Sequence, residues 1–308
     1  MPLLPGVQRL IDMASDGPSL AEVPIEVART RLDAMSAAFG PGDPVGATAE
    51  VDIPTPAGSL RARVYHPRET PELPPALYFH GGGWSVGGLG TGDAFCRKLT
   101  ARARGVVVNV DYRLAPEHPH PAAVEDALAA AAWLYGDPAL NPEGAGILVV
   151  GDSAGGNLAA VVAQESRTTA DFDVRAQLLL CAAVNLTHRE GSYQDFSKGY
   201  FVSISEFEHW ISLYAPGRDL ADPRLSPGAA TELAGIPPAL VVTAEYDPLR
   251  DAGEAYGRAL REAGVDASVL RIEGQVHDFP VLGDLIPEGD AAVHTLAEHW
   301  RTLVLTSP

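Results

Sequence analysis

Two segments of the chain carry the pattern Gly-x-Ser-x-Gly, which can hold a reactive serine on a sharp turn between a strand and a helix. One copy centres on Ser153 and the other on Ser85. Ser153 lies between an apolar, strand-like run at 147–150 and an unbroken helical run at 157–164. Ser85 is followed instead by closely spaced glycines, which do not start a helix. Ser153 is therefore the predicted nucleophile.

A serine hydroxyl has no unusual acidity, so it needs a base, and the base needs an acid to orient it. In a parallel sheet, both partners should come from loops at the carboxyl ends of later strands. Asp247 follows the apolar run 240–243, and His277 follows the run 268–272. We predict that these two residues complete a triad with Ser153. Taken alone, Asp247 before a proline would equally fit the cap of a following helix.

A run of three glycines, Gly81–Gly83, follows the apolar run 76–79. Such a run lets backbone N–H groups approach a ligand closely, and the N–H of Ala154 supplies another donor. These donors could hold a negative charge that develops during a reaction. A nucleotide-binding loop is disfavoured, because no Gly-Lys-Ser/Thr follows and no Gly-x-Gly-x-x-Gly opens a helix.

The elements that must position these residues form an α/β pattern. After a hairpin over 46–66, short apolar runs alternate with loops and helical segments, which is typical of a mostly parallel sheet flanked by helices. Residues 1–45 show helical spacing, and residues 185–224 form an aromatic, irregular insertion without a strand. The predicted strands are 76–79, 106–110, 147–150, 178–182, 240–243 and 268–272.

The chain has 308 residues, with 22 basic and 40 acidic side chains and a net charge of −18. This balance argues against nucleic-acid binding and against an anionic membrane surface. Two cysteines, Cys96 and Cys181, cannot form a framework of disulfides, and Cys181 ends an apolar run typical of a buried thiol. Because no apolar stretch approaches twenty residues, we expect a soluble, cytoplasmic protein.

The chain resembles the hormone-sensitive-lipase-like (bacterial family IV) carboxylesterases of the α/β-hydrolase superfamily over about residues 75–283. The resemblance implies that Ser153, Asp247 and His277 form the triad and that Gly82, Gly83 and Ala154 donate to the oxyanion. Five ordered segments carry it: His80-Gly-Gly-Gly-Trp84, Asp111-Tyr-Arg-Leu-Ala-Pro-Glu117, Gly151-Asp-Ser-Ala-Gly-Gly-Asn157, Asp247-Pro-Leu-Arg-Asp251 and His277-Asp-Phe279.

The same resemblance implies an α/β-hydrolase core with a helical cap. The predicted division is 1–45 for the N-terminal cap helices, 46–184 for the first part of the core, 185–224 for the cap insertion and 225–308 for the second part of the core. Apolar side chains of these segments would line the substrate pocket. The candidates are Trp84, Met35, Phe39, Phe201, Trp210 and Tyr214.

The predicted reaction is hydrolysis of a carboxylic ester through an acyl-enzyme, with a small-molecule ester as partner and no metal or organic cofactor. The resemblance implies that the acyl groups are short to medium in length. Amide or formamide hydrolysis, or acyl transfer, by the same triad remains open. A non-catalytic small-molecule receptor on the same scaffold is an alternative from another class, but it has no need of His277. The resemblance also implies a possible homodimer through the strand at 268–272.

One departure from the family pattern lies beside the predicted base. The position after the catalytic histidine is commonly glycine in this family, whereas this chain has Asp278. A second carboxylate there favours the imidazolium, so we predict a raised pKa for His277.

Overall fold

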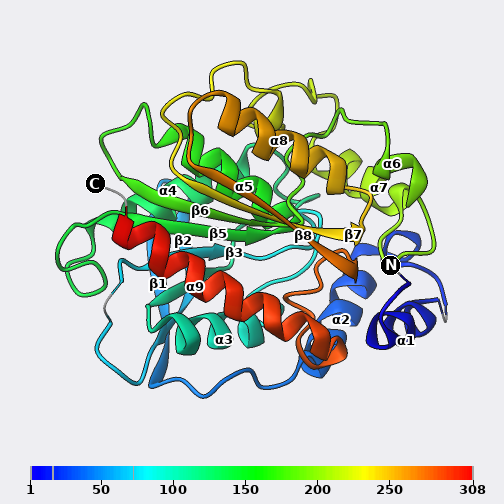
Figure 1. Ribbon diagram of the computed structural model, residues 1–308, viewed down its shortest axis with the longest axis horizontal. Coiled ribbons are helices and arrows are strands. Elements are labelled where there is room, and N and C mark those ends of the chain that lie inside the picture. Colours follow the sequence, from blue (N-terminus) through cyan, green and yellow to red (C-terminus); the bar gives the residue numbers. More distant parts are fainter. Residues whose placement is uncertain (1, 16, 72, 307–308) are drawn as a thin grey trace.

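The computed structural model describes residues 2–15, 17–71 and 73–306, which contain one eight-stranded sheet in the order β1-β2-β4-β3-β5-β6-β7-β8. The first two strands form an antiparallel hairpin, and β2 pairs antiparallel with β4. Every other neighbouring pair is parallel, so the predicted α/β class is confirmed (Figure 1). The strands are β1 (Ala47–Thr55), β2 (Gly58–His66), β3 (Ala76–Phe79), β4 (Val107–Val110), β5 (Ile147–Asp152), β6 (Val174–Leu180), β7 (Ala239–Tyr246) and β8 (Ala267–Val276).

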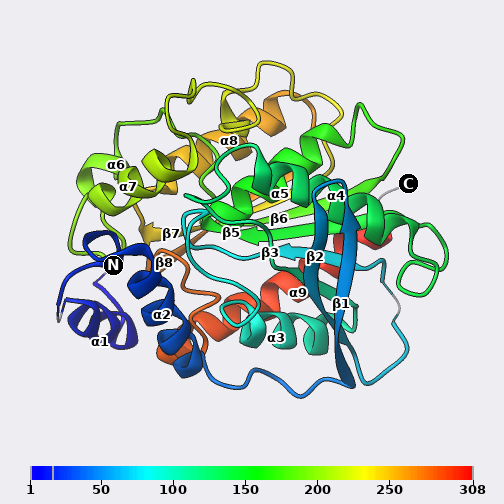
Figure 2. The same cartoon turned by 180° about the vertical axis from the view of Figure 1, so that it is seen from behind.

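Helices cover both faces of the sheet because its central strands are mostly apolar and are buried along their whole length. One face carries α4 (Ala122–Gly136), α5 (Ser153–Glu165) and α8 (Arg250–Glu262). The other carries α3 (Asp93–Ala103) and α9 (Asp290–Thr306) (Figures 1 and 2). No helix among the described residues has the length and apolar character needed to cross a bilayer.

A third group of helices lies beyond the carboxyl ends of the parallel strands (Figure 1). The segment before the hairpin supplies α1 (Pro5–Ala14) and α2 (Ile25–Ser36), so helices form where residues 1–45 predicted them. The segment after β6 supplies α6 (Ser192–Asp195) and α7 (Ile204–Tyr214). Trp210 of α7 packs against Ala28 and Leu32 of α2, which joins the two segments. Short 3₁₀ turns occur at Leu20–Glu22, Ala37–Phe39, Pro227–Ala229, Gly283–Leu285 and Pro287–Gly289.

Several strand ends differ from the sequence prediction, and three of them bear on the site. The strand predicted at 178–182 ends at Leu180, because Cys181 has a φ of 45° and turns the chain. The strand predicted at 268–272 instead continues to Val276. Its polar tail stays in the sheet through a bulge, in which the N–H of Gly274, with a φ of 74°, donates to the Glu245 carboxylate over 2.7 Å. The strand predicted at 240–243 likewise continues to Tyr246, so the last two parallel strands both reach the edge where the site forms.

Candidate active site

The predicted nucleophile lies at the junction of β5 and α5. Ser153 is the first residue of the helix and has a φ of 52°, a conformation that costs energy for a residue with a side chain. A Cβ on Gly155 would collide with the backbone carbonyl of Phe79, so the turn needs glycine at that position. This tight turn holds the Ser153 hydroxyl at the carboxyl edge of the sheet.

The structure brings the three predicted triad residues together. The Nε2 atom of His277 lies 2.8 Å from Ser153 Oγ, and its Nδ1 atom lies 2.8 Å from Asp247 Oδ2. Asp247 Oδ1 also accepts the N–H of Leu249 over 2.8 Å, so its carboxylate serves the turn into α8 as well as the imidazole. With Nδ1–H donating to Asp247, Nε2 is free to accept the serine proton.

A second carboxylate adjoins the imidazole on its serine side. Asp278 Oδ2 lies 3.4 Å from His277 Nε2, and its Oδ1 is buried without a hydrogen-bond partner in the part of the chain that is described. Burial lowers the pKa of His277, but the charges of Asp247 and Asp278 outweigh it, and the net pKa is raised. Burial raises the pKa of Asp278 well above its usual range, against the opposing charge of His277.

The glycine loop follows β3 and is fixed by Asp152, the last residue of β5. The Asp152 carboxylate accepts the N–H of Gly81 over 2.9 Å and the hydroxyl of buried Tyr78. Burial raises the pKa of Asp152 to about 6. Gly82 and Gly83 line the cavity beside Ser153, at φ of 111° and 57°. Asp152, which precedes the nucleophile, thus holds the backbone of Gly81 at the start of the glycine run.

A cavity of about 260 Å³ opens beside Ser153 and His277. Four of the predicted pocket residues line it: Met35, Phe39, Phe201 and Trp210. Trp84 and Tyr214 were also predicted to line the pocket, but the structure does not bring them there. Their rings stack on each other with centroids 4.5 Å apart, and both residues are fully buried in the main core.

Sequence reasoning missed Glu206, which α7 contributes to the same cavity together with the aromatic ring of Phe207. Burial raises the pKa of Glu206 to about 7. The spacing Ser203-x-x-Glu206 indicates only a helix start, and the Ser203 hydroxyl does accept the Glu206 N–H over 3.2 Å. The pattern therefore predicts the start of a helix but does not predict that the Glu206 side chain also lines the cavity.

The second Gly-x-Ser-x-Gly copy forms no nucleophile turn. Ser85 is fully buried, and its carbonyl accepts the Nε–H of Arg29 from α2 over 3.0 Å. The same guanidinium donates to the carbonyl of Ala115 over 2.9 Å and to both carboxylate oxygens of Glu117. Arg29 thereby ties α2 to the loop that carries the glycine run.

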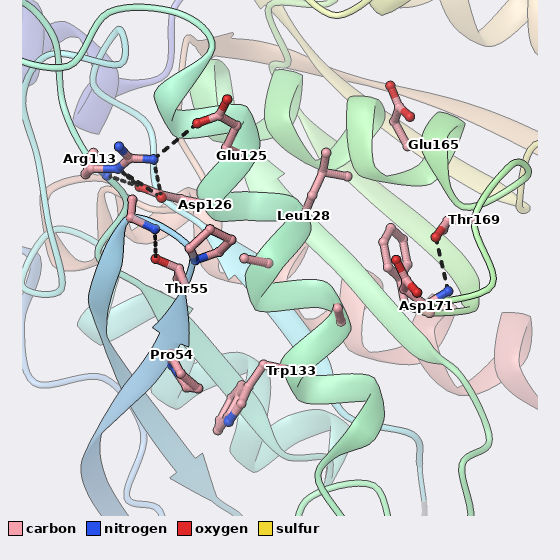
Figure 3. A pocket seen from close by; sticks show the side chains of 15 residues that line it. Pro54, Thr55, Arg113, Glu125, Asp126, Leu128, Trp133, Glu165, Thr169 and Asp171 are labelled. Atoms are coloured by element: carbon pink, nitrogen blue, oxygen red, sulfur yellow. Dashed lines mark hydrogen bonds and ion pairs between the residues drawn. The ribbon is translucent and has the colours of Figure 1, made fainter.

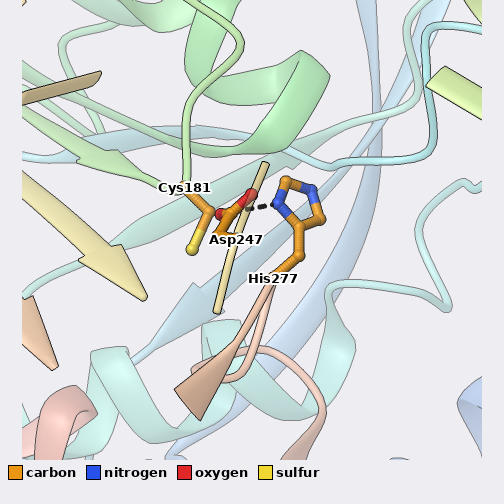
Figure 4. A group of neighbouring side chains, drawn as sticks. All are labelled: Cys181, Asp247 and His277. Carbon is orange, nitrogen blue, oxygen red and sulfur yellow. Dashed lines mark hydrogen bonds and ion pairs between the residues drawn. The ribbon is translucent and has the colours of Figure 1, made fainter. Parts of the chain in front are cut away.

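The free thiol of Cys181 is buried, as its apolar run predicted, and lies next to Asp247 and His277 (Figure 4). Its sulfur, a carboxylate oxygen of Asp247 and a ring nitrogen of His277 all lie within 4.8 Å of one another. Burial raises the pKa of this thiol, as does the neighbouring Asp247 charge. The three side chains offer donors suited to a metal ion. A metal there would compete for the Asp247–His277 hydrogen bond that orients the base.

A larger groove of about 900 Å³ lies elsewhere, between α4 and the turn of the β1–β2 hairpin (Figure 3). Trp133 of α4 lies beside Pro54 of the hairpin, whereas Leu128 of α4 points to the side of the helix where Glu165 and Thr169 lie. Its main charged pair is Arg113 with the buried Asp126, joined over 2.8 Å. None of the predicted site residues lines this groove.

Comparisons with known proteins agree with this geometry. Residues 76–281 match the model of a family with the alpha/beta hydrolase fold. The carboxylic ester hydrolase LipN of Mycobacterium tuberculosis is 41% identical over 83% of this chain and 70% of its own length. An arylesterase of Saccharolobus solfataricus is 37% identical over 82% and 83%. The structure of a hyperthermophilic esterase from Pyrobaculum calidifontis superposes with a TM-score of 0.92, at 37% identity, covering 99% of this chain and 100% of the other.

Proposed function

The chain belongs to the α/β-hydrolase family, among the esterases of the hormone-sensitive-lipase-like group, and we propose that Ser153, His277 and Asp247 carry out its ester hydrolysis. The observation that carries the proposal is the continuous hydrogen-bonded chain from Asp247 through His277 to Ser153, with 2.8 Å at each step. A non-catalytic receptor on this scaffold would not need these two hydrogen bonds.

Acylation would begin when His277 Nε2 takes the proton of Ser153 and the serine oxygen attacks the ester carbonyl. The imidazolium is stabilised by Asp247 and then gives its proton to the leaving alcohol. A water molecule then attacks the acyl-enzyme, again with His277 as the base, and the carboxylic acid departs. Apart from the ester and water, these steps use only side-chain and backbone groups of the protein.

The N–H groups of Gly82, Gly83 and Ala154 are the proposed donors to the tetrahedral oxyanion. Gly82 and Gly83 line the cavity beside Ser153, and Ala154 follows the nucleophile at the start of α5. Aligned donors at such a position act on charge that appears only in the transition state. The Asp152 contact with Gly81 supports their alignment.

We also propose that residues 1–45 and 185–224 act as the cap over this site, on a core formed by 46–184 and 225–308. The packing of Trp210 against α2 supports this division. A cavity of about 260 Å³ is slightly smaller than most ligand sites, which span roughly 300–1,000 Å³. This size favours short to medium acyl groups.

The proposal includes a cytoplasmic location and a homodimer. The buried free thiols Cys96 and Cys181 suit a reducing compartment. β8 is the outermost strand of the sheet and offers its edge for pairing with a second copy. Light scattering coupled to size exclusion would test the dimer, and a monomeric mass would reject it.

The test of the activity is a panel of p-nitrophenyl esters of increasing acyl length beside matched anilides. We expect turnover of the short esters, with Ser153→Ala abolishing it. Ser85→Ala is the matched control, because it alters the buried serine of the other Gly-x-Ser-x-Gly copy. Loss of turnover in the Ser85 variant alone would show that Ser85, and not Ser153, is the nucleophile. Faster cleavage of the anilides than of the esters would assign an amidase.

A further inference from the structure

The cavity beside Ser153 has an unusual balance of charge. Three carboxylates line it, from β5, α7 and the segment after β8: Asp152, Glu206 and Asp278. Apart from His277, whose pKa is raised, the one basic side chain among the described lining residues is Arg31, which is exposed and donates to the carbonyl of Pro18 over 3.2 Å. Asp152 is occupied by its bonds to Tyr78 and Gly81. Glu206 and Asp278 remain as acidic groups that a substrate can meet. Burial raises the pKa of both carboxyl groups, and a bound cation would favour their ionised forms.

Asp278 lies where the alcohol part of an ester must pass. The leaving oxygen receives its proton from His277 Nε2, so it must come within hydrogen-bond distance of that atom. Asp278 Oδ2 is 3.4 Å from the same nitrogen. A group two carbons beyond the leaving oxygen therefore stays within a few bond lengths of the Asp278 carboxylate. Its other oxygen, Oδ1, is buried and lacks a hydrogen-bond donor within the described chain.

The walls of the cavity suit a cation as well. Phe39, Phe201, Phe207 and Trp210 line it together with Glu206. Aromatic faces attract a desolvated ammonium, most strongly when a carboxylate shares the site. A protonated amine would find there a π surface and the Asp278 carboxylate, to which its N–H can donate.

Resting on the ester hydrolysis proposed above, we propose that this cavity selects esters whose alcohol carries a protonated amine, held by Asp278 and Glu206. Such an amine donates its N–H to Asp278 Oδ2, the oxygen beside His277 Nε2, and its charge is attracted to Glu206 in the same cavity. Esters of short amino alcohols are therefore the substrate class that this site fits. Carboxylate-bearing alcohols would be repelled by the same two groups.

The test uses two acetates of the same shape. One is 2-(dimethylamino)ethyl acetate, which is protonated at neutral pH, and the other is 3-methylbutyl acetate, in which a CH replaces the N–H. We expect kcat/KM for the cationic ester to exceed that for the neutral one by about tenfold. Asp278→Asn and Glu206→Gln should each reduce this ratio severalfold. Asparagine tolerates the φ of 57° at position 278, so the first variant keeps the backbone.

Glu208→Gln is the matched control, because it removes a carboxylate from the same helix at a residue that contacts Tyr193 and Arg189 instead of the cavity. It should leave the ratio unchanged. Inhibition by 2-(dimethylamino)ethanol, compared with 3-methylbutanol, gives a second measurement that does not depend on catalytic rate. The amino alcohol should inhibit more strongly in the unaltered protein, and this advantage should shrink in both cavity variants.

A ratio of one or less in the unaltered protein would overturn the cation subsite, as would a ratio that both cavity variants leave unchanged. The wider proposal fails in a different way. If Ser153→Ala still hydrolyses 3-methylbutyl acetate, the triad is wrong. Hydrolysis of both acetates at equal rates, lost in Ser153→Ala, would retain the esterase and reject the subsite alone.

Discussion

The groove beside α4 encloses about 900 Å³, more than three times the 260 Å³ of the cavity beside Ser153. In the groove, the main charged groups neutralise each other, with Asp126 holding the Arg113 guanidinium at 2.8 Å. In the cavity, a serine, an imidazole and carboxylates converge within hydrogen-bond distance, and their pKa values are shifted. Convergent groups that perturb one another mark a reactive site better than volume does.

Exchanging one carboxylate for an amide in each region tests this contrast most strongly. Asp247→Asn removes the group that orients His277, so we expect kcat for a short p-nitrophenyl ester to fall about 10⁴-fold. Asp126→Asn should leave kcat within about twofold while lowering the free energy of unfolding by about 1–3 kcal/mol, because the Arg113 guanidinium loses its buried partner. Steady-state kinetics and urea unfolding measure both. A comparable fall in kcat in the two variants would show that the contrast is mistaken.

Arg29→Met tests whether α2 supports the reacting groups from outside the cavity. It removes the bonds to the carbonyls of Ser85 and Ala115 and the pair with Glu117, so the glycine loop loses a tether. We expect kcat to fall about tenfold with little change in KM, and the free energy of unfolding to fall by about 1–2 kcal/mol. Glu117→Gln is the milder control, since Glu117 is half exposed and the carbonyl contacts remain. A change confined to KM would instead assign Arg29 to substrate binding.

The pH dependence of turnover tests the second carboxylate beside the base. Asp278 helps to raise the pKa of His277, and only the neutral imidazole accepts the serine proton. Removing that charge lowers the pKa, so in Asp278→Gly the acidic limb of kcat/KM should move to lower pH by roughly one unit. Glycine adopts the φ of 57° without strain, which keeps the fold intact. A limb that stays in place would falsify this account of the imidazole.

Trp133→Ala should have the smallest effect on the reaction. It removes a large side chain from the groove wall and leaves the hydrogen bonds of the triad untouched. We expect kcat/KM for short esters to stay within about twofold, with a loss of stability of about 1–2 kcal/mol from the partly buried ring. Parallel measurements of turnover and thermal unfolding check both parts. A tenfold loss of turnover without unfolding would connect the groove to the reaction.

The sequence allowed prediction of the parts that depend on short-range pattern. Buried parallel strands appear as wholly apolar runs, and a nucleophile turn needs glycine close to its serine. The order of strands then implied that Asp247 and His277 would meet Ser153 at one edge of the sheet. These inferences needed no knowledge of how distant side chains pack.

The cavity walls could not be predicted in this way. Trp84 and Tyr214 are aromatic and near the site in sequence, yet their rings stack on each other within the core. Glu206 lies in the cavity on α7, whose Trp210 shares a buried cluster with Ala28 and Leu32 of α2, and such packing between segments far apart in the chain does not show in a local pattern. β6 ends at Leu180 because the following residue, Cys181, has a φ of 45°, and residue type alone does not reveal this backbone angle.

The contacts of Arg29 also show which positions of α2 can be varied in protein engineering and which one should be kept. Leu32 and Met35, one and two turns further along the helix, face the substrate cavity, while Arg29 is bound to the loop behind it. A library that randomises positions 32 and 35 would reshape the acyl or alcohol site on a helix that is still anchored. Including position 29 would mix changes in specificity with loss of the anchor, and selected variants would be harder to interpret.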